Sequence, residues 1–459
     1  MGVLDNARVI HSSSGPGQAA GAVAPAGVSI HDKETVTLGH WLIVIIASLG
    51  WLFDCMDQRL FILARESAMR ELLGVTTTTD AVRTVSTYAT TAMILGWATG
   101  GIFFGMMSDR WGRVKTMVAT LLVYSGFTGL SGFATGWVDF TIYRFLVGLG
   151  VGGMFGAATT LVAESVPGRV RSVALGALQA LSALGNILGS LISLNVQPGA
   201  TDLIWGYSGW RVLFFVGILP SLLVIPIVLY LREPEVWRRA KAEAARGGGR
   251  KNVGSIAELF RHPRWRRHAV IGLLLGVSGM IGLWGIGFFS PELITNALAG
   301  APQATIDRVR AYGTALQDTG AFLGMLVFTA VASLVSRRLA FFFAFLAGLL
   351  VTAFVFNSLR TANDAYWMLP MVGFAQLSLF AGYSIYFPEL FPTRLRGTGV
   401  GFCYNTVRYL AAPAPILLGY LSSLLSFRTA AVVMSSVYLI GMVALLWAPE
   451  TKGQPLPED

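Results

Sequence analysis

The sequence predicts an all-α membrane protein with twelve transmembrane helices arranged in two six-helix bundles. Hydrophobic residues make up 54% of the 459-residue chain and charged residues only 13%, whereas a soluble domain carries about 25% charged residues. Twelve apolar runs reach the length of roughly 20 residues that an α-helix needs to cross a bilayer. A motif in the first six runs also recurs in the second six.

The first predicted span starts at Trp41 and extends to Arg65. Residues 1–38 before it are small and polar, so we expect a disordered cytoplasmic tail there. The other eleven spans follow as apolar runs between short loops; their ranges are 84–107, 115–135, 139–162, 171–194, 210–231, 268–290, 311–335, 338–357, 366–388, 398–424 and 428–448.

A polar stretch at 232–267 separates the two groups of six spans. It gives a first bundle at 39–231, a second at 268–448 and a cytoplasmic C-terminal tail at 449–459. The stretch contains eleven Lys or Arg against four Glu, and an excess of Lys and Arg is typical of cytoplasmic loops. We therefore expect a basic cytoplasmic linker, both termini in the cytoplasm, and a multi-pass protein of the inner (plasma) membrane. The net charge of +10 reflects such loops, so we expect no nucleic-acid partner.

The two halves are related in sequence. The segment AESVPGRVRSVALG, from Ala163, aligns with PELFPTRLRGTGVG, from Pro388, at a constant offset of 225 residues. The aligned charged residues are Glu164 with Glu389 and Arg171 with Arg396, which we expect to take part in gating, and at the same offset Arg113 with Arg338. Two related halves predict a substrate site between them, near the bilayer midplane.

Two carboxylates lie inside the first span, at Asp54 and Asp57. Their spacing of three residues places them on one helical face. An acid in a membrane costs about 2.5–3.5 kcal/mol on insertion scales and is usually functional. Arg144, in the fourth span, needs a partner at its depth in the membrane, and Asp57 lies at a comparable depth. We predict that these three residues couple transport to protons; the alternative is that the acids only reach the interface at a helix end.

The motif GMMSDRWGRVK lies between the second and third spans. Its glycines, Gly105 and Gly112, allow two helices to approach closely, and Asp109, Arg110 and Arg113 form a charged cluster behind them. Such a cluster can hold two helices together by ion pairs in one state and release them in another. A plain cytoplasmic basic loop would explain the arginines, but not the aspartate with both glycines. The corresponding second-half segment SLVSRRL lacks the acid and the glycines, so we expect an asymmetric gate.

GMMSDRWGRVK and RFLVGLGVGG, from Arg144, resemble the loop 2–3 and helix 4 signatures of the major facilitator superfamily. WRVLFFVGILPSLLVIPIVLYLREPEVW, ELFPTRLRGTG and PETKG are similar to sequences of its sugar-porter and metabolite:proton symporter branches. The resemblance covers the chain after residue 38 and implies the major facilitator fold. The four residues from Asp54 to Asp57 resemble the D-x-aromatic-D signature of aromatic-acid, sialate and lactate proton symporters, with Met56 in place of the aromatic.

Arg408 lies near the middle of the eleventh span, and Tyr404 and Asn405 share its helical face. A forked guanidinium suits a carboxylate; the alternative is a permanent ion pair with an acid such as Asp318 in the eighth span. Further side chains that could contact a polar solute, each of which could equally serve a helix–helix contact, are Gln179, Asn186, Gln317, Gln376 and Trp284.

We therefore expect a monomeric secondary active transporter without a cofactor, whose partners are a small-molecule substrate, protons and the lipid bilayer. It would move a small organic anion, such as a monocarboxylate, together with protons by alternating access. A proton-coupled sugar or polyol porter is the main alternative; the absence of paired glutamines from GVSGMIGLWGIGFF counts against a hexose. A transporter-like membrane sensor would need an added docking domain. The few histidines lie in the tails and the linker, and no nucleophile–base arrangement points to an enzyme.

Overall fold

The computed structural model describes residues 35–74, 78–246 and 253–458. Most of the predicted tail 1–38 therefore lies outside the described residues, as does part of the predicted linker. The helices of the first bundle are α1 (Leu38–Leu73), α2 (Thr79–Trp111), α3 (Arg113–Ser131), α4 (Trp137–Ser165), α5 (Gly168–Val196), and α6 (Gly209–Val216), η2 (Leu219–Leu223) and α7 (Val224–Tyr230), which together make the sixth span.

Two short helices, α8 (Glu235–Arg246) and α9 (Ile256–Arg261), follow before the second bundle. The elements of that bundle are α10 (Pro263–Met280), η3 (Ile281–Ile286), η4 (Gly287–Phe289), α11 (Ser290–Ala297), α12 (Gln303–Leu334), α13 (Arg337–Ser358), α14 (Ala362–Leu390), α15 (Arg396–Ala411), α16 (Ala414–Leu424), α17 (Phe427–Met434) and α18 (Val437–Ala444).

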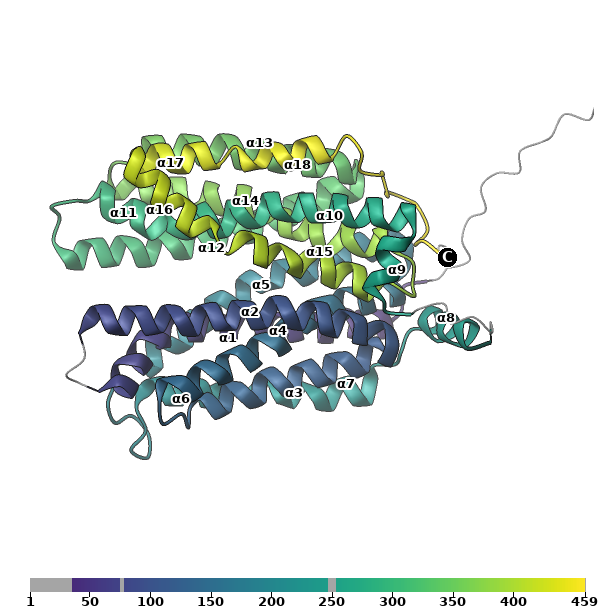
Figure 1. Ribbon diagram of the computed structural model, residues 1–459, viewed down its shortest axis with the longest axis horizontal. Helices are drawn as coiled ribbons and strands as arrows, with labels where there is room; N and C mark the ends of the chain where they lie inside the picture. Colours follow the sequence, from purple (N-terminus) through teal and green to yellow (C-terminus); the bar gives the residue numbers. More distant parts are fainter. Residues whose placement is uncertain (1–34, 75–77, 247–252, 459) are drawn as a thin grey trace, which may run out of the picture.

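The predicted fold class is confirmed: a helical membrane protein built from two bundles that lie side by side (Figure 1). Ten helices of the described ranges are long and apolar enough to cross a membrane. The two remaining predicted spans correspond to α3, of 19 residues, and to the pair α15 and α16. That pair is interrupted because Pro413 precedes α16 and has no backbone N–H with which to continue the helix.

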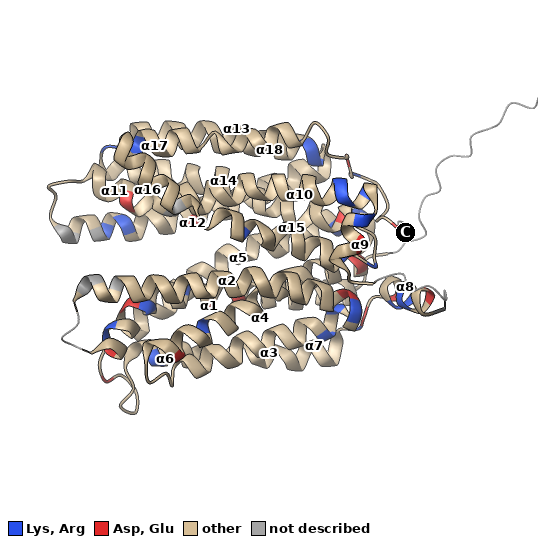
Figure 2. Ribbon diagram, in the orientation of Figure 1, with Lys and Arg blue, Asp and Glu red and all other residues tan. Residues whose placement is uncertain are grey.

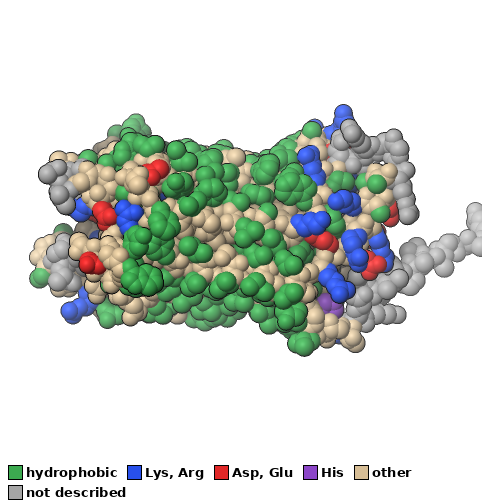
Figure 3. Space-filling view, turned by 90° about the horizontal axis from the view of Figure 1, so that it is seen from below, with side chains coloured by type: hydrophobic (Ala, Val, Ile, Leu, Met, Phe, Trp, Pro, Cys, Tyr) green, Lys and Arg blue, Asp and Glu red, His purple; other side chains and the backbone are tan. Residues whose placement is uncertain are grey.

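Charged side chains gather at the two ends of the molecule (Figure 2), and an apolar band surrounds its middle (Figure 3). Large apolar residues such as Leu194 and Ile416 are 71% and 75% exposed, as expected where lipid replaces water as the solvent. We call the end that carries α8, α9 and the C-terminus the basic end. The opposite end, which carries the turns after α1 and α11, is the distal end.

Close packing of α2 against α4 depends on glycine. A Cβ at Gly148 would lie 2.2 Å from the Met93 carbonyl oxygen, and a Cβ at Gly152 would lie 2.1 Å from that of Trp97. These distances explain the RFLVGLGVGG spacing as a device that lets two helix backbones meet.

Gly148→Ala is expected to force α2 and α4 apart and to lower the thermal unfolding temperature of the purified protein by several degrees. A Cβ at Gly156, on the same helix, would meet nothing within 4 Å. Gly156→Ala is therefore the matched control, and it should be neutral or slightly stabilising, since alanine is the better helix former. Equal melting temperatures for the two variants would contradict the packing role of Gly148.

Candidate functional site

The two bundles are joined at the basic end by Asp109. Its carboxylate is fully buried and accepts hydrogen bonds from the backbone N–H groups of Gly397 (3.0 Å) and Thr398 (2.8 Å) and from the Thr398 hydroxyl (2.7 Å). Asp109 ends α2 in the first bundle, whereas its partners begin α15 in the second. A carboxylate is favoured at a helix N-terminus because the first N–H groups are unpaired and carry partial positive charge. We call this contact the Asp109 latch.

A second contact between the bundles runs through Glu164. Arg113 donates to its carboxylate from Nη2 (2.8 Å) and Nε (2.9 Å), and Arg396 donates from Nη1 (2.5 Å). Arg113 also lies 3.1 Å from Asp109 and donates to the carbonyl of Thr393. Both arginines are fully buried. The first-half motif therefore forms one charged network that includes residues of both bundles.

The counterpart network in the second bundle shows one wrong prediction. The constant offset pairs Arg113 with Arg338, but Arg337 occupies the equivalent place: it begins α13 as Arg113 begins α3, and it lies 3.0 Å from Glu389. The offset between the glutamates is 225 residues and that between the arginines is 224, so the halves differ by one residue in length between these points.

The two charged networks differ in their contacts. At the offset of 224, the counterpart of Asp109 is Ser333, whose hydroxyl forms a hydrogen bond of 2.8 Å with that of Ser172, near the start of α5. Arg171, the repeat partner of Arg396, is half-buried, and Arg110 is exposed, with its Nε donating to the Val253 carbonyl at 3.3 Å. The carboxylate contacts of Asp109 to α15 thus have no carboxylate counterpart at the repeat-related position, Ser333.

Glu450, in the PETKG segment, caps the counterpart network. Burial acts to raise the pKa of its carboxyl group, but hydrogen bonds outweigh burial and lower the pKa. The donors are the Ser336 hydroxyl and the backbone N–H groups of Lys452, Arg337 and Arg338. This segment therefore secures the start of α13, as Glu233 secures the start of α3 by accepting from the Arg113 N–H at 2.7 Å.

Asp109→Asn is expected to slow transport severalfold without loss of folding or membrane insertion. The amide keeps one acceptor oxygen but loses the charge that the α15 N-terminus and Arg113 stabilise, so the closed state of the basic end is weakened. Initial uptake rates per molecule of inserted protein would measure the effect. Glu235→Gln, which removes an exposed carboxylate from α8, is the control. A native transport rate in the Asp109 variant would show that the Asp109 latch does not control transport.

A cavity of about 410 Å³ lies between the bundles. Its lining reaches Arg65, Glu292 and Arg310, which lie toward the distal end, whereas the Asp109 latch lies at the basic end. The predicted substrate residues in its wall are Arg408, Tyr404, Gln179, Asn186, Gln317, Asp318 and Trp284. Asn405 lies behind Arg408, and Gln376 instead donates to the Thr352 hydroxyl at 3.0 Å.

Arg408 is held in the cavity wall with its charge available. Nη1 donates to the Tyr404 carbonyl (2.8 Å) and to Asn405 Oδ1 (3.1 Å), and the guanidinium carbon lies 3.9 Å from the Trp97 ring centroid. Among the described residues, the buried Nε has no hydrogen-bond partner and no acid forms an ion pair with this arginine. The alternative pairing with Asp318 is not formed, because Asp318 binds another arginine.

That arginine is Arg59, which the sequence reasoning did not single out. It extends from α1 and donates to Asp318 on α12, so the pair crosses the cavity from one bundle to the other. Both side chains remain partly exposed, at 22% and 16%. Arg59 lies inside the first apolar run, where the rule that intramembrane charges are functional would have identified it.

Asp54 and Asp57 are not among the residues that line the cavity. Both are fully buried inside the first bundle, and their carboxylate oxygens have no hydrogen-bond partner among the described residues. Asp57 Oδ2 is 4.0 Å from Arg144 Nη1. Arg144 donates to the Ser131 hydroxyl at 2.6 Å and lies over a set of aromatic rings, those of Phe61, Phe140 and Phe214. Ionised carboxylates are expensive in such surroundings unless they are paired with a positive charge.

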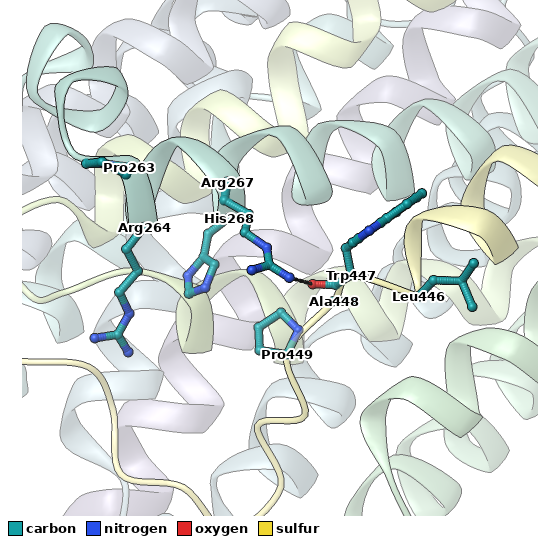
Figure 4. Close-up of a pocket in the computed structure, with 8 residues that line it drawn as sticks. All are labelled: Pro263, Arg264, Arg267, His268, Leu446, Trp447, Ala448 and Pro449. Carbon is teal, nitrogen blue, oxygen red and sulfur yellow. Dashed lines mark hydrogen bonds between the residues drawn. The ribbon is translucent and has the colours of Figure 1, made fainter.

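A cavity of about 460 Å³ opens elsewhere, on the second bundle at the basic end (Figure 4). Arg264, Arg267 and His268 of α10 line one part and residues 446–449 another. Arg267 donates to the Trp447 carbonyl at 3.2 Å. All of its walls belong to one bundle, so movement of the bundles against each other would not expose it alternately to two sides. We therefore place the candidate site in the cavity between the bundles.

Comparison with known proteins agrees with this geometry. The family profile described as Major Facilitator Superfamily matches residues 41–414. The cis,cis-muconate transport protein of Acinetobacter baylyi is 29% identical, over 79% of this chain and 84% of that protein. The sialic acid transporter NanX of Escherichia coli is 29% identical, over 82% of this chain and 86% of that protein. The gentisate transporter of Corynebacterium glutamicum is 25% identical, over 83% of this chain and 84% of that protein.

Two solved structures share the fold. The proton:xylose symporter XylE superimposes with a TM-score of 0.73 at 18% identity, over 91% of this chain and 97% of that one. The human organic anion transporter MFSD10 superimposes with a TM-score of 0.67 at 15% identity, over 88% of this chain and 99% of that one. At these identities, the likeness concerns the arrangement of the helices and not the substrate.

Proposed function

The chain belongs to the Major Facilitator Superfamily, and we propose that it carries a small organic anion together with a proton across the inner membrane. The observation that carries this proposal is Arg408: a nearly buried guanidinium in the wall of the cavity between the bundles, without an acidic partner among the described residues. A charge in this position needs a counter-ion, and a carboxylate matches the guanidinium fork in charge and geometry.

The cavity wall also favours an acid with an unsaturated or aromatic body. Trp51, Trp97, Trp284, Phe380 and Tyr404 all line it, and flat apolar groups stack well on such rings. Transport of muconate, gentisate and sialic acid by the relatives supports an organic acid in general. A neutral sugar would leave the Arg408 charge uncompensated when the cavity closes.

Proton binding would occur at carboxylates that are buried in the first bundle and do not line the cavity. Asp57, with Asp54 one turn away, takes up a proton from the distal side, since burial and mutual repulsion both disfavour two ionised carboxylates. Protonation of Asp57 weakens its attraction to Arg144 and removes a buried charge before the cavity closes. The later loss of the proton to the cytoplasm is favoured by Arg144, which stabilises the ionised form.

Alternating access requires the contacts at the basic end to break. The Asp109 latch and the Arg396–Glu164 ion pair each join one bundle to the other, so both must open before substrate leaves toward the basic end. The positive-inside rule assigns that end, and with it both termini, to the cytoplasm. Residues 39–231 and 268–448 would then move as two bodies of a monomer, around the filled cavity.

The test is uptake of labelled acids and labelled sugars into liposomes that contain the purified protein. Uptake is measured with and without a pH gradient in which the outside is more acidic than the lumen. We expect one or more acids to accumulate only with the gradient and the sugars to remain at background. Gradient-driven accumulation of a neutral sugar, with no acid transported, would contradict the proposal.

A further inference from the structure

The cavity between the bundles contains more positive charge than one carboxylate can balance. Four arginines line it, Arg59, Arg65, Arg310 and Arg408, against two acids, Glu292 and Asp318. The excess is therefore two positive charges. The other polar side chains of the wall, such as Gln179, Asn186 and Gln317, are uncharged, so the excess is best balanced by bound anionic charge.

Arg59 is the second guanidinium of the cavity that lies deep enough to contact a substrate held by Arg408. Cys55 and Arg408 line the same cavity, and Arg59 follows Cys55 by one helical turn, about 6 Å along α1. The two guanidinium groups come from opposite bundles and face the same cavity. An extended molecule with a carboxylate at each end could contact both.

Asp318 holds Arg59 in this structure. The contact is a single hydrogen bond, from Nη2 to Oδ2, and the pair keeps some exposure to the cavity. A ligand carboxylate can therefore take the place of Asp318 on the guanidinium fork, with gain of a bidentate contact. Asp318 then acts as an internal competitor that occupies Arg59 when no such ligand is bound.

We propose that Arg59 forms a second carboxylate subsite, and that the preferred substrates are dicarboxylates that bridge Arg408 in the second bundle and Arg59 in the first. This inference rests on the proposed function, because it takes Arg408 as the first carboxylate site. It also gives the substrate a direct role in bringing the bundles together, since one molecule binds both.

Adipate and monomethyl adipate test the subsite, because they share length and shape but differ by one charge. Binding of each to the purified full chain in detergent would be measured by calorimetry at neutral pH. We expect adipate to bind at least tenfold more tightly than the monoester. In Arg59→Gln the ratio of the two affinities should fall to about one. In Asp318→Asn the ratio should rise, since the residue that competes with the ligand for Arg59 is gone.

The double variant Arg59→Gln/Asp318→Asn removes the pair without a change in net charge, and its binding of the monoester reports that it is folded. It should bind both ligands alike. Arg239→Gln, on the exposed face of α8, should keep the native preference. Equal binding of both ligands by the native protein, or a preference that survives in the double variant, would overturn the dicarboxylate subsite while leaving Arg408 as a carboxylate site. Failure of the native protein to bind any carboxylate would instead overturn the proposed function.

Discussion

Arg408→Ala is expected to weaken acid binding by about 100-fold or more, which corresponds to roughly 2.7 kcal/mol, and to abolish measurable uptake. The guanidinium is 4% exposed and faces a cavity wall of aromatic rings. Without it, a bound carboxylate would lose both its charge partner and its hydrogen-bond donors in a site poor in water. The cost is larger than at an exposed site because little solvent screens the interaction.

Arg408→Lys separates charge from geometry. A lysine keeps the positive charge but replaces the planar fork by a point charge, so we expect a loss of about tenfold. Affinity measured by calorimetry and initial rates in liposomes should fall in the same order for the two variants. Arg264→Ala, which removes an exposed arginine from the start of α10, is the control. Native affinity in Arg408→Ala would show that the substrate binds elsewhere.

Asp57→Asn is expected to abolish uphill uptake while substrate exchange continues. Exchange needs no net proton movement, whereas accumulation by one proton per monoanion depends on the pH gradient, which supplies about 1.4 kcal/mol per pH unit. The native protein should therefore raise the ratio of inside to outside acid concentration to about ten per pH unit. In the variant this ratio should stay at about one. Paired exchange and gradient-driven uptake in the same liposome preparation would measure both.

Asp54→Asn distinguishes the two carboxylates. Asp57 is the acid that lies within ion-pair distance of Arg144, so the Asp54 variant should have the milder defect. The stronger defect in Asp54→Asn would reverse the assigned roles. Accumulation at the native level in both variants would mean that neither aspartate carries the proton.

The sequence was sufficient for the spans because bilayer crossing imposes a simple requirement for apolar length. It also identified Arg144 as a partner for Asp57, since an intramembrane arginine needs an acid at its own depth. Broken spans were harder to predict. Neither the interruption of the eleventh span at Pro413 nor the irregular turns at η3 and η4 changes the hydropathy of the run in which it occurs.

Contacts between distant helices could not be predicted from one sequence. Helical spacing places Asp54 and Asp57 on one face of α1, but it does not say that Asp57 meets Arg144 of α4 while neither aspartate lines the cavity. The partner of Asp318 proved to be Arg59 and not Arg408, because the rotation of α12 about its axis is set by packing. The error of one residue at Arg337 arose from a length difference between the repeats, which a constant offset cannot represent.

The central claim is that an acid and a proton cross together through this protein, and lumenal pH tests it most directly. Liposomes that contain the native chain and a trapped pH indicator would receive a transported acid from outside without an imposed gradient. Protein-free liposomes would correct for passive permeation. The account predicts that the lumen acidifies in step with uptake of the labelled acid; uptake by the native protein with no acidification beyond that of protein-free liposomes would contradict it.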